Sequence, residues 1–269
     1  MNLASIIKAI ALFSVVISFP VGAAFGKEGA ENFAEQATVV GSATTLNAAA
    51  HYLDSVFEGT LASLELVALT PEARGGDWKG IRQYLESLES RLPGTYFYVK
   101  PDGNYYSLAL DYTDHNLLDR PYFASLFAGN PVRGYQIYGR SSGRKSALMA
   151  APIMVDGGVN GALGAAIHLD DLHQKLNRDF ALPENYTWFV LDSGGTTILD
   201  RDRDFIFMNA LTQGSPSLQD AVKEALQNES GSVSYELGAL RHAHYRKLPR
   251  MDWWIFLAQI QSMDAPASQ

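Results

Sequence analysis

Apolar residues recur at three- and four-residue steps along residues 28–70, and this spacing predicts one face of a long α-helix. Pro71 and the pair Gly75-Gly76 predict its end. A helix of this length is typical of a spine that packs on a domain or a partner, and an ordinary core helix is the alternative. The stripe comprises Phe33, Ala37, Val40, Leu46, Ala49, Leu53, Val56, Phe57, Leu61, Leu64 and Val67.

A second helix is predicted over residues 77–92. Asp77 has the side chain of a helix N-cap, and Pro93-Gly94 predicts the end of the helix. Its apolar face would carry Ile81, Tyr84, Leu85, Leu88 and Leu92.

After Gly94 the period of the apolar positions changes to that of β-strands. Residues 95–112, TYFYVKPDGNYYSLALDY, predict two strands joined by a Pro-Asp-Gly turn. A short helix ending at Gly129 follows, and then come three strands within GYQIYGR, SALMAAPIMV and VNGALGAAIHL. Residues 170–180 predict a helix that leads out of this module.

The same order of elements then repeats. YTWFVLD and TTILD predict a hairpin, SLQDAVKEALQN an amphipathic helix, and GSVSYEL, LRHAHYRK and DWWIFLAQI three closing strands. Each repeat is an antiparallel sheet with helices on one face, so the predicted class is α+β. The predicted divisions are an export signal at 1–26, a helical spine at 27–92, modules at 93–180 and 181–262, and a disordered tail at 263–269.

The first 26 residues have the pattern of an export signal. Lys8 precedes the apolar run AIALFSVVISFPVGAAFG, which ends in the A-x-A-like Ala24-Phe25-Gly26. Cleavage after Gly26 or Ala24 would release a periplasmic protein. An uncleaved membrane anchor is the alternative, because about 18 apolar residues can just span a bilayer. Pro20 and the small residues at the end of the run favour cleavage.

The composition argues against a nucleic-acid partner and excludes cysteine-based chemistry. The 269 residues carry 21 Lys+Arg against 29 Asp+Glu, a formal charge of -8 that repels nucleic acid. The absence of cysteine excludes disulfides, thiolate zinc sites, a cysteine nucleophile and a lipid-modified cysteine. Hydrophobic residues at 47% and charged residues at 19% are typical of a folded chain.

The order of these segments resembles the double Cache family of extracytoplasmic sensors, over roughly residues 28–262. The matching words are YFYVKPDGNYYS, LDRPYF, GRSSGRKSALMAAPI and GGVNGALGAAIHLDDL, and then WFVLDSGGTTILD, SGSVSYEL and YRKLPRMDWWIFLAQ. The resemblance implies two tandem PAS-like modules and a small solute bound in the first. Because the sequence stops after its last strand, we expect a stand-alone member that signals through a separate partner.

Arg120 is the first candidate for ligand contact. Its guanidinium fits a carboxylate bidentately, and Tyr122 and Phe123 offer flat apolar walls and a hydroxyl. In similar Cache modules this arginine and the aromatic residues after it face the ligand. A surface pair between Arg120 and Asp119, beside a packed aromatic side chain, is the alternative.

The next strand adds further candidates. Tyr135 lies on one face of it, and Tyr138 and Arg140 lie on the other. Either set could face the ligand or be ordinary strand residues.

The last strand of the first module adds His168. Amino-acid-binding relatives carry an aspartate on this strand, and the matching position here is Ala166. The resemblance therefore favours simple carboxylates over α-amino acids. His168 lies on the same face and could donate to a carboxylate, or it could be a satisfied polar residue at a strand end.

No pattern indicates an enzyme. His242 and His244 share one face of a strand, but no third ligand is evident nearby, so we expect solvated histidines with Ala243 and Tyr245 facing inward. The sequence contains no G-x-S-x-G, H-E-x-x-H or P-loop. We therefore expect no metal, no cofactor and no catalytic residues.

Three functions compete at this stage. A ligand-binding sensor module accounts for the resemblance and for the long helix, which could also form a homodimer or contact a membrane sensor. A periplasmic solute-binding protein for a transporter predicts alternating βα units, which the pattern lacks. An exported hydrolase requires a recognisable set of catalytic residues, and the sequence shows none.

Overall fold

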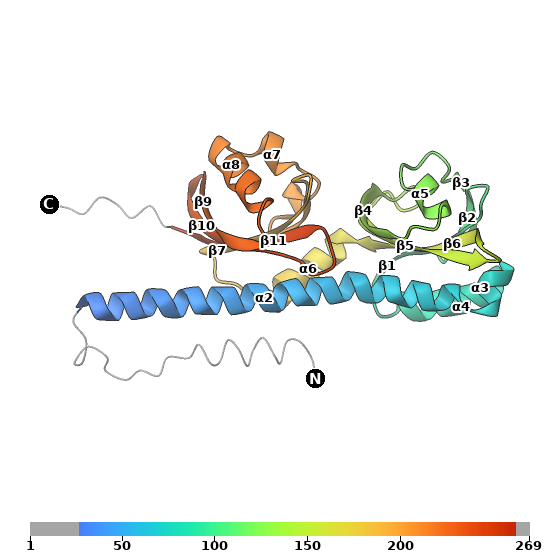
Figure 1. Cartoon of the computed structure of the whole chain (residues 1–269), viewed down its shortest axis with the longest axis horizontal. Helices are drawn as coiled ribbons and strands as arrows, with labels where there is room; N and C mark the ends of the chain where they lie inside the picture. Colours follow the sequence, from blue (N-terminus) through green and yellow to red (C-terminus); the bar gives the residue numbers. More distant parts are fainter. Residues whose placement is uncertain (1–26, 262–269) are drawn as a thin grey trace. The chain divides into compact units, whose positions relative to one another are not determined.

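The computed structural model describes residues 27–261, with side chains from residue 41 onward. The predicted export signal and the predicted tail therefore lie outside the described residues. The described chain forms two compact units (Figure 1). We call residues 52–172 with 249–251 the first module, and residues 27–51, 173–248 and 252–261 the second module. The division at Leu172 falls inside a helix, whereas the sequence places the boundary at residue 180, where that helix ends.

The predicted long helix is present as α2 (Lys27–Ala68). Where its side chains are described, the predicted stripe is buried at Leu46, Ala49, Leu53, Phe57, Leu61, Leu64 and Val67. Pro71 does more than end this helix, because it begins the short helix α3 (Pro71–Gly75). Proline is tolerated there because the first turn has no acceptor for its missing N–H.

The second predicted helix is α4 (Trp78–Glu89), and Asp77 caps it as expected. The Asp77 carboxylate accepts a hydrogen bond from the Lys79 N–H at 3.1 Å. Ile81 and Leu85 are fully buried, whereas Tyr84 is exposed. Within the described residues, no helix combines the length and the apolar character that a membrane span requires.

The sheet of the first module has six strands in the order β3-β2-β1-β6-β5-β4, all antiparallel. Helix α5 (Phe123–Phe127) lies over one face, and α3 and α4 lie over the other (Figure 1). The strands are β1 (Gly94–Val99), β2 (Asn104–Ser107), β3 (Asp111–Asn116), β4 (Val132–Tyr138), β5 (Lys145–Val155) and β6 (Gly158–His168).

Strand β3 was not expected, because the sequence predicts one continuous strand from Asn104 to Tyr112. The chain instead turns at Asp111, whose φ of 54° lies in the left-handed region. Asp111 accepts hydrogen bonds from Trp78 Nε1 at 3.1 Å and from Arg82 Nη1. These partners on α4 hold the turn, and Tyr106 then pairs with Tyr112 across β2 and β3.

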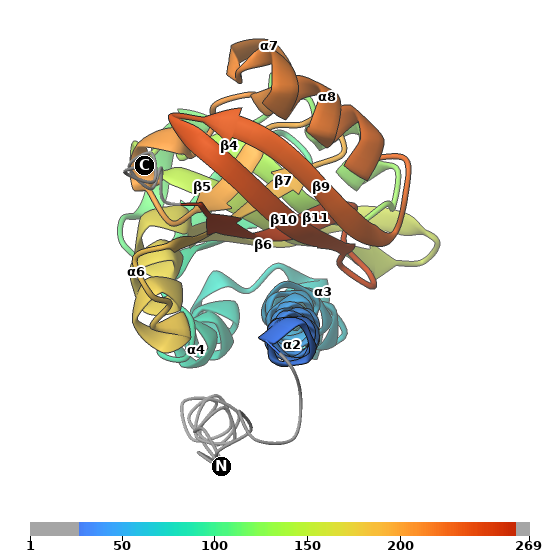
Figure 2. The ribbon, with the colours of Figure 1, turned by 90° about the vertical axis from the view of Figure 1, so that its left-hand side faces the viewer.

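The sheet of the second module has five antiparallel strands in the order β8-β7-β11-β10-β9. Helices α7 (Ala210–Gln213) and α8 (Pro216–Ala225) lie over one face of this sheet (Figures 1 and 2). The strands are β7 (Tyr186–Asp192), β8 (Thr197–Asp200), β9 (Ser230–Leu237), β10 (Ala239–Lys247) and β11 (Trp253–Ile260). The α6 helix (Leu169–Phe180) precedes β7, and a 3-10 turn, η2 (Arg203–Phe205), follows β8.

The two sheets repeat one plan, as the sequence predicts. In each, an opening hairpin pairs with the last strand of the module, through β1 with β6 and β7 with β11. The chain is therefore α+β, with a long N-terminal helix and two antiparallel sheets.

Candidate functional site

A tight turn after β3 positions Arg120 and Tyr122. The Arg120 N–H donates to the Leu117 carbonyl at 3.0 Å, and the Phe123 N–H donates to the Arg120 carbonyl at 2.9 Å. The second of these bonds leads directly into α5. Arg120 therefore stands just before the helix, with the aromatic pair at the helix start.

Only part of the hydrogen-bonding capacity of the Arg120 guanidinium is satisfied within the described residues. Its Nη2 donates to the main-chain carbonyl of Tyr138 at 3.0 Å, which fixes the side chain against β4. Its Nε is buried and has no hydrogen-bond partner among the described residues. A buried charged donor without an acceptor costs free energy, and an anionic oxygen of a ligand could accept the hydrogen bond from this N–H.

Arg140 takes the partner that the sequence suggested for Arg120. Its Nη2 lies 2.8 Å from Asp119 Oδ2, and its Nη1 donates to the Asn116 carbonyl at 2.5 Å. The hydrogen bond from Arg140 lowers the pKa of the Asp119 carboxyl. Because Asp119 is largely exposed and is held by Arg140, it does not neutralise Arg120 through an ion pair of its own.

Tyr122 and Phe123 are buried beside these arginines. The Tyr122 ring meets that of Tyr135 edge-on, with the centroids 5.5 Å apart, and Phe123 stacks on Phe127 at 4.3 Å. Burial raises the pKa of Tyr122 to about 12, while the charge of Arg120 acts in the opposite direction. The phenol therefore keeps its proton at neutral pH and can donate it in a hydrogen bond.

The two faces of β4 separate as the alternation predicts. Tyr135 lies with buried Ile137 on the face that contacts Tyr122. The side chain of Tyr138 is exposed, so its main-chain carbonyl rather than its ring meets Arg120. The structure thus brings together Arg120, Tyr122, Phe123, Tyr135 and Arg140, with Tyr138 contributing backbone.

Small residues of β6, Ala162 and Ala166, pack in the apolar cluster that contains Tyr122 and Phe123. A Cβ on Gly164 would come within 2.1 Å of Phe97 Cζ, so only glycine leaves room for that ring. Ala166, the position where the resemblance places an aspartate in amino-acid-binding relatives, is buried in apolar surroundings.

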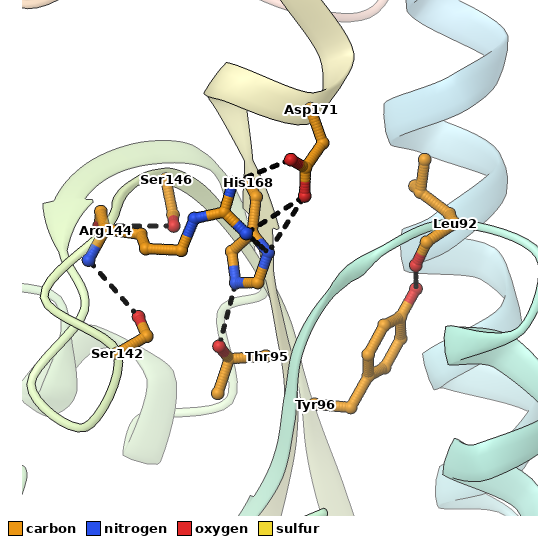
Figure 3. A network of polar contacts seen from close by, with 8 residues as sticks. All are labelled: Leu92, Thr95, Tyr96, Ser142, Arg144, Ser146, His168 and Asp171. Carbon is orange, nitrogen blue, oxygen red and sulfur yellow. Dashed lines mark hydrogen bonds and ion pairs between the residues drawn. The ribbon is translucent and has the colours of Figure 1, made fainter. Parts of the chain in front are cut away.

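His168 belongs to a different set of contacts at the end of β6 (Figure 3). Arg144 Nη1 lies 2.8 Å from His168 Nδ1, and Thr95 Oγ1 lies 3.0 Å from Nε2. Because arginine can only donate, Nδ1 is the acceptor and the ring proton is on Nε2, which donates to Thr95. Arg144 also grips Asp171 bidentately, at 2.7 and 3.0 Å.

The physical setting of His168 indicates a structural role. Burial lowers its pKa, and the positive charge of Arg144 lowers it further, so the imidazole is neutral at neutral pH. The ring and its partners tie the end of β6 to the start of α6. The sequence analysis did not single out Arg144, because the contacts of Arg144 are 24 and 27 residues away in the chain.

The paired histidines of β10 face away from the core, as predicted. His242 Nδ1 lies 2.7 Å from Ser234 Oγ, and His244 Nδ1 lies 2.7 Å from Ser232 Oγ. Ala243 and Tyr245 are the buried residues of that strand segment. Each histidine thus has a serine partner on the neighbouring strand.

The second module contains a cavity of about 570 Å³ that sequence analysis did not single out. It opens over the face of the sheet that carries Phe189, Tyr235 and Arg241. Tyr235 and Arg241 lie directly opposite each other on β9 and β10. The alternation of apolar and polar residues places Tyr235 on the buried face of its strand. The other residues that line the cavity come from separate segments of the chain, so no local pattern reveals it. The polar and charged residues of its lining include His173, Glu184, Asp200, Arg201, Asp202 and Arg203.

No protein-family model matches this chain, and no curated protein matches it. Solved structures do match it. The extracellular domain of rpHK1S-Z16, assigned as a histidine kinase, has a TM-score of 0.71 at 17% identity, with 85% of this chain and 97% of that chain covered.

Two chemoreceptor domains match comparably. The ligand-binding domain of the amino acid chemoreceptor PctB of Pseudomonas aeruginosa PAO1, solved with L-Arg, has a TM-score of 0.63 at 18% identity, with 87% of this chain and 97% of that chain covered. The ligand-binding domain of the chemoreceptor CtaA of Pseudomonas fluorescens, solved with L-serine, has a TM-score of 0.63 at 14% identity, with 87% and 98% covered. The chain therefore has the fold of Cache-type extracellular sensor domains, which confirms the expectation from the sequence.

Proposed function

We propose that this chain is an extracytoplasmic sensor module that binds a small carboxylate in its first module. Arg120 is the primary contact, Tyr122 and Phe123 form the wall, and Tyr135 and Arg140 border the site. Tyr138 holds Arg120 through its main-chain carbonyl. His168 belongs to this proposal as a residue that holds the end of β6 in place.

The observation that carries the proposal is the buried Nε of Arg120, which has no acceptor among the described residues. A carboxylate bound there would supply that acceptor and would itself be neutralised by the guanidinium. The protonated phenol of Tyr122 is a second donor beside it. Ala166 offers no charge to an ammonium group, which favours carboxylates without an amine at this site.

The proposed role is binding and signalling rather than catalysis. The matched solved structures are sensor domains of a histidine kinase and of chemoreceptors, which supports a module that reports ligand occupancy to another protein. We propose a periplasmic location after removal of residues 1–26. A transporter-linked solute-binding protein of the α/β type is disfavoured, because both described sheets are antiparallel.

Part of the proposed partner contact lies on α2. From Leu46 onward the apolar stripe of this helix is buried within the chain itself. A homodimer or a membrane sensor partner would therefore use residues 27–45. Deleting this segment and measuring mass by light scattering tests the contact, and a monomer both before and after deletion would remove the homodimer from the proposal.

A thermal-shift screen tests the binding function. The mature protein is melted with acetate, lactate, pyruvate, succinate or citrate, and with matched amines that lack a carboxylate. A ligand at 100 times its dissociation constant stabilises the fold by about 2.7 kcal/mol. Stabilisation by one carboxylate, lost in Arg120→Ala and kept in Arg133→Ala, is the expected result. Arg133 is the matched control because it lies on β4, exposed and paired with Glu58 at 3.2 Å.

A further inference from the structure

The cavity of the second module has the dimensions of a small-molecule site. Its volume of about 570 Å³ lies within the range of roughly 300–1,000 Å³ common for such sites. Phe189 and Leu191 of β7 form apolar walls on the sheet side. Met208, which follows β8, and Leu218 of α8 add further apolar lining. An apolar body of a ligand would therefore be well accommodated.

Arg241 and Tyr235 present hydrogen-bond donors in the lining of the cavity. The Arg241 Nη2 donates to the Leu237 carbonyl at 3.1 Å, which holds the side chain in place. The Arg241 Nε is buried and has no hydrogen-bond partner among the described residues. Tyr235, directly opposite on β9, is only 2% exposed, and burial raises its pKa to about 12, while the charge of Arg241 and a hydrogen bond with it act in the opposite direction. The guanidinium and the protonated phenol thus present donors for one carboxylate.

The lining of the cavity also carries a carboxyl group. Asp200 ends β8 and accepts a hydrogen bond from the Asp202 N–H at 2.8 Å. Burial raises its pKa to about 7, and the charge of Arg241 acts in the opposite direction. A carboxyl in such surroundings is stabilised as the anion by a cation placed against it.

Phe189 lies beside both groups. It pairs with Asp200 across β7 and β8, and its ring meets that of Tyr235 edge-on, with the centroids 6.3 Å apart. Arg241 and Asp200 are each held by main-chain groups rather than by each other. The positive and negative groups therefore flank one aromatic ring in the same cavity, which suits a ligand that carries both charges.

We propose that the second module binds a small zwitterion of the amino acid type in this cavity. Its carboxylate lies at Arg241 and Tyr235, its ammonium lies at Asp200, and its side chain lies against Phe189. This site is separate from the carboxylate site proposed for the first module, and it uses none of the same residues.

Calorimetric titration of the whole mature protein with each of the twenty L-amino acids tests this site. The titrations are run in the Arg120→Ala background, so the first module's proposed site does not contribute. The tightest amino acid is then compared with its deaminated acid and its decarboxylated amine. Variants Arg241→Ala and Asp200→Asn are paired with Arg246→Ala, an arginine on the same strand whose position alternates to the opposite face.

We expect at least one amino acid to bind, with affinity lowered tenfold or more by Arg241→Ala and by Asp200→Asn. Arg246→Ala should change nothing. Both monofunctional analogues should bind at least tenfold more weakly than the amino acid. If Arg241→Ala does not fold, Tyr235→Phe tests the carboxylate contact instead and should weaken binding severalfold. No binding by any amino acid, or equal binding by the deaminated acid with no effect of Asp200→Asn, would overturn the proposal.

Discussion

Arg120 donates from Nη2 to the main-chain carbonyl of Tyr138 at 3.0 Å, and this single bond leaves its Nε buried without an acceptor among the described residues. The carbonyl fixes the direction of the guanidinium without neutralising its charge. The nearest acidic side chain in sequence, Asp119, is held by Arg140 instead. A fixed guanidinium with no ion pair among the described residues, beside buried aromatic rings, suits a small anionic ligand.

Gly164→Ala should destabilise the first module. The new Cβ would lie 2.1 Å from Phe97 Cζ, so the ring would have to leave its place in the apolar cluster. Overpacking of this kind costs about 1–3 kcal/mol, which denaturant unfolding can measure. Gly158→Ala is the matched control on the same strand, since its Cβ would meet only the Val155 carbonyl at 3.9 Å. Equal effects of the two substitutions would contradict this packing.

The pH dependence of stability should carry a contribution from Asp200. Its pKa is about 7 in the folded protein against 3.8 as the ordinary value. Between these values the unfolded chain loses the proton and the folded chain keeps it, so stability falls as pH rises from about 4 to 7 and the penalty persists above. Asp200→Asn should remove this decline and stabilise the protein at pH 8 by on the order of 2 kcal/mol, since partial exposure screens the full shift. Unchanged melting curves across pH 4–8 would contradict it.

His168 should make the opposite contribution. Its pKa lies below the ordinary 6.5, first through burial and then through Arg144. The unfolded chain therefore binds the proton more readily, and stability is lost as pH falls below about 6.5. His168→Gln should flatten that part of the stability profile in chemical denaturation. An unchanged slope below about pH 6.5 in His168→Gln would refute the assignment.

Arg144→Ala should destabilise the first module without weakening carboxylate binding. The substitution removes the bidentate pair with Asp171 and the donor to His168 Nδ1. Because the ion pair is about one-third exposed, the loss should be about 1 kcal/mol. Urea unfolding measures it, and calorimetry with the carboxylate from the screen measures binding. Loss of binding in a folded Arg144→Ala protein would instead place this network at the ligand.

The export signal makes a prediction that needs no ligand. Mass spectrometry of the exported protein should find a start at Lys27 or Phe25. An intact Met1 start in the membrane fraction would favour the anchored alternative.

The periodicity of the sequence predicted the fold well where local signals agree. The stripe from Leu46 to Val67 and the cap at Asp77 both appear in the structure. Strand β3 was missed because the break at Asp111 depends on Trp78 and Arg82, which are 33 and 29 residues away. Alternation continues through that segment and gives no sign of the turn.

The candidate sites show the same limit. The residue types in the sequence singled out Arg120 as a candidate. That its Nε is buried without an acceptor among the described residues can be seen only in the structure. The cavity of the second module escaped notice because Asp200, Tyr235 and Arg241 lie on three different strands, each with an ordinary local pattern. Asp200 and Tyr235 lie on the two edge strands of the sheet, β8 and β9, and only the folded module brings them into one cavity, which no short segment encodes.

The most direct test of the account is calorimetric titration of wild type and Arg120→Ala with the carboxylate that most stabilises the wild type. Hydrogen bonds to charged groups contribute about 1.5–3 kcal/mol each, so the account predicts a dissociation constant raised tenfold or more in the variant. Arg120→Lys should recover only part of the affinity, because an ammonium cannot reproduce the planar fork. Arg133→Ala should bind as the wild type does. An unchanged dissociation constant in a folded Arg120→Ala protein would contradict the account.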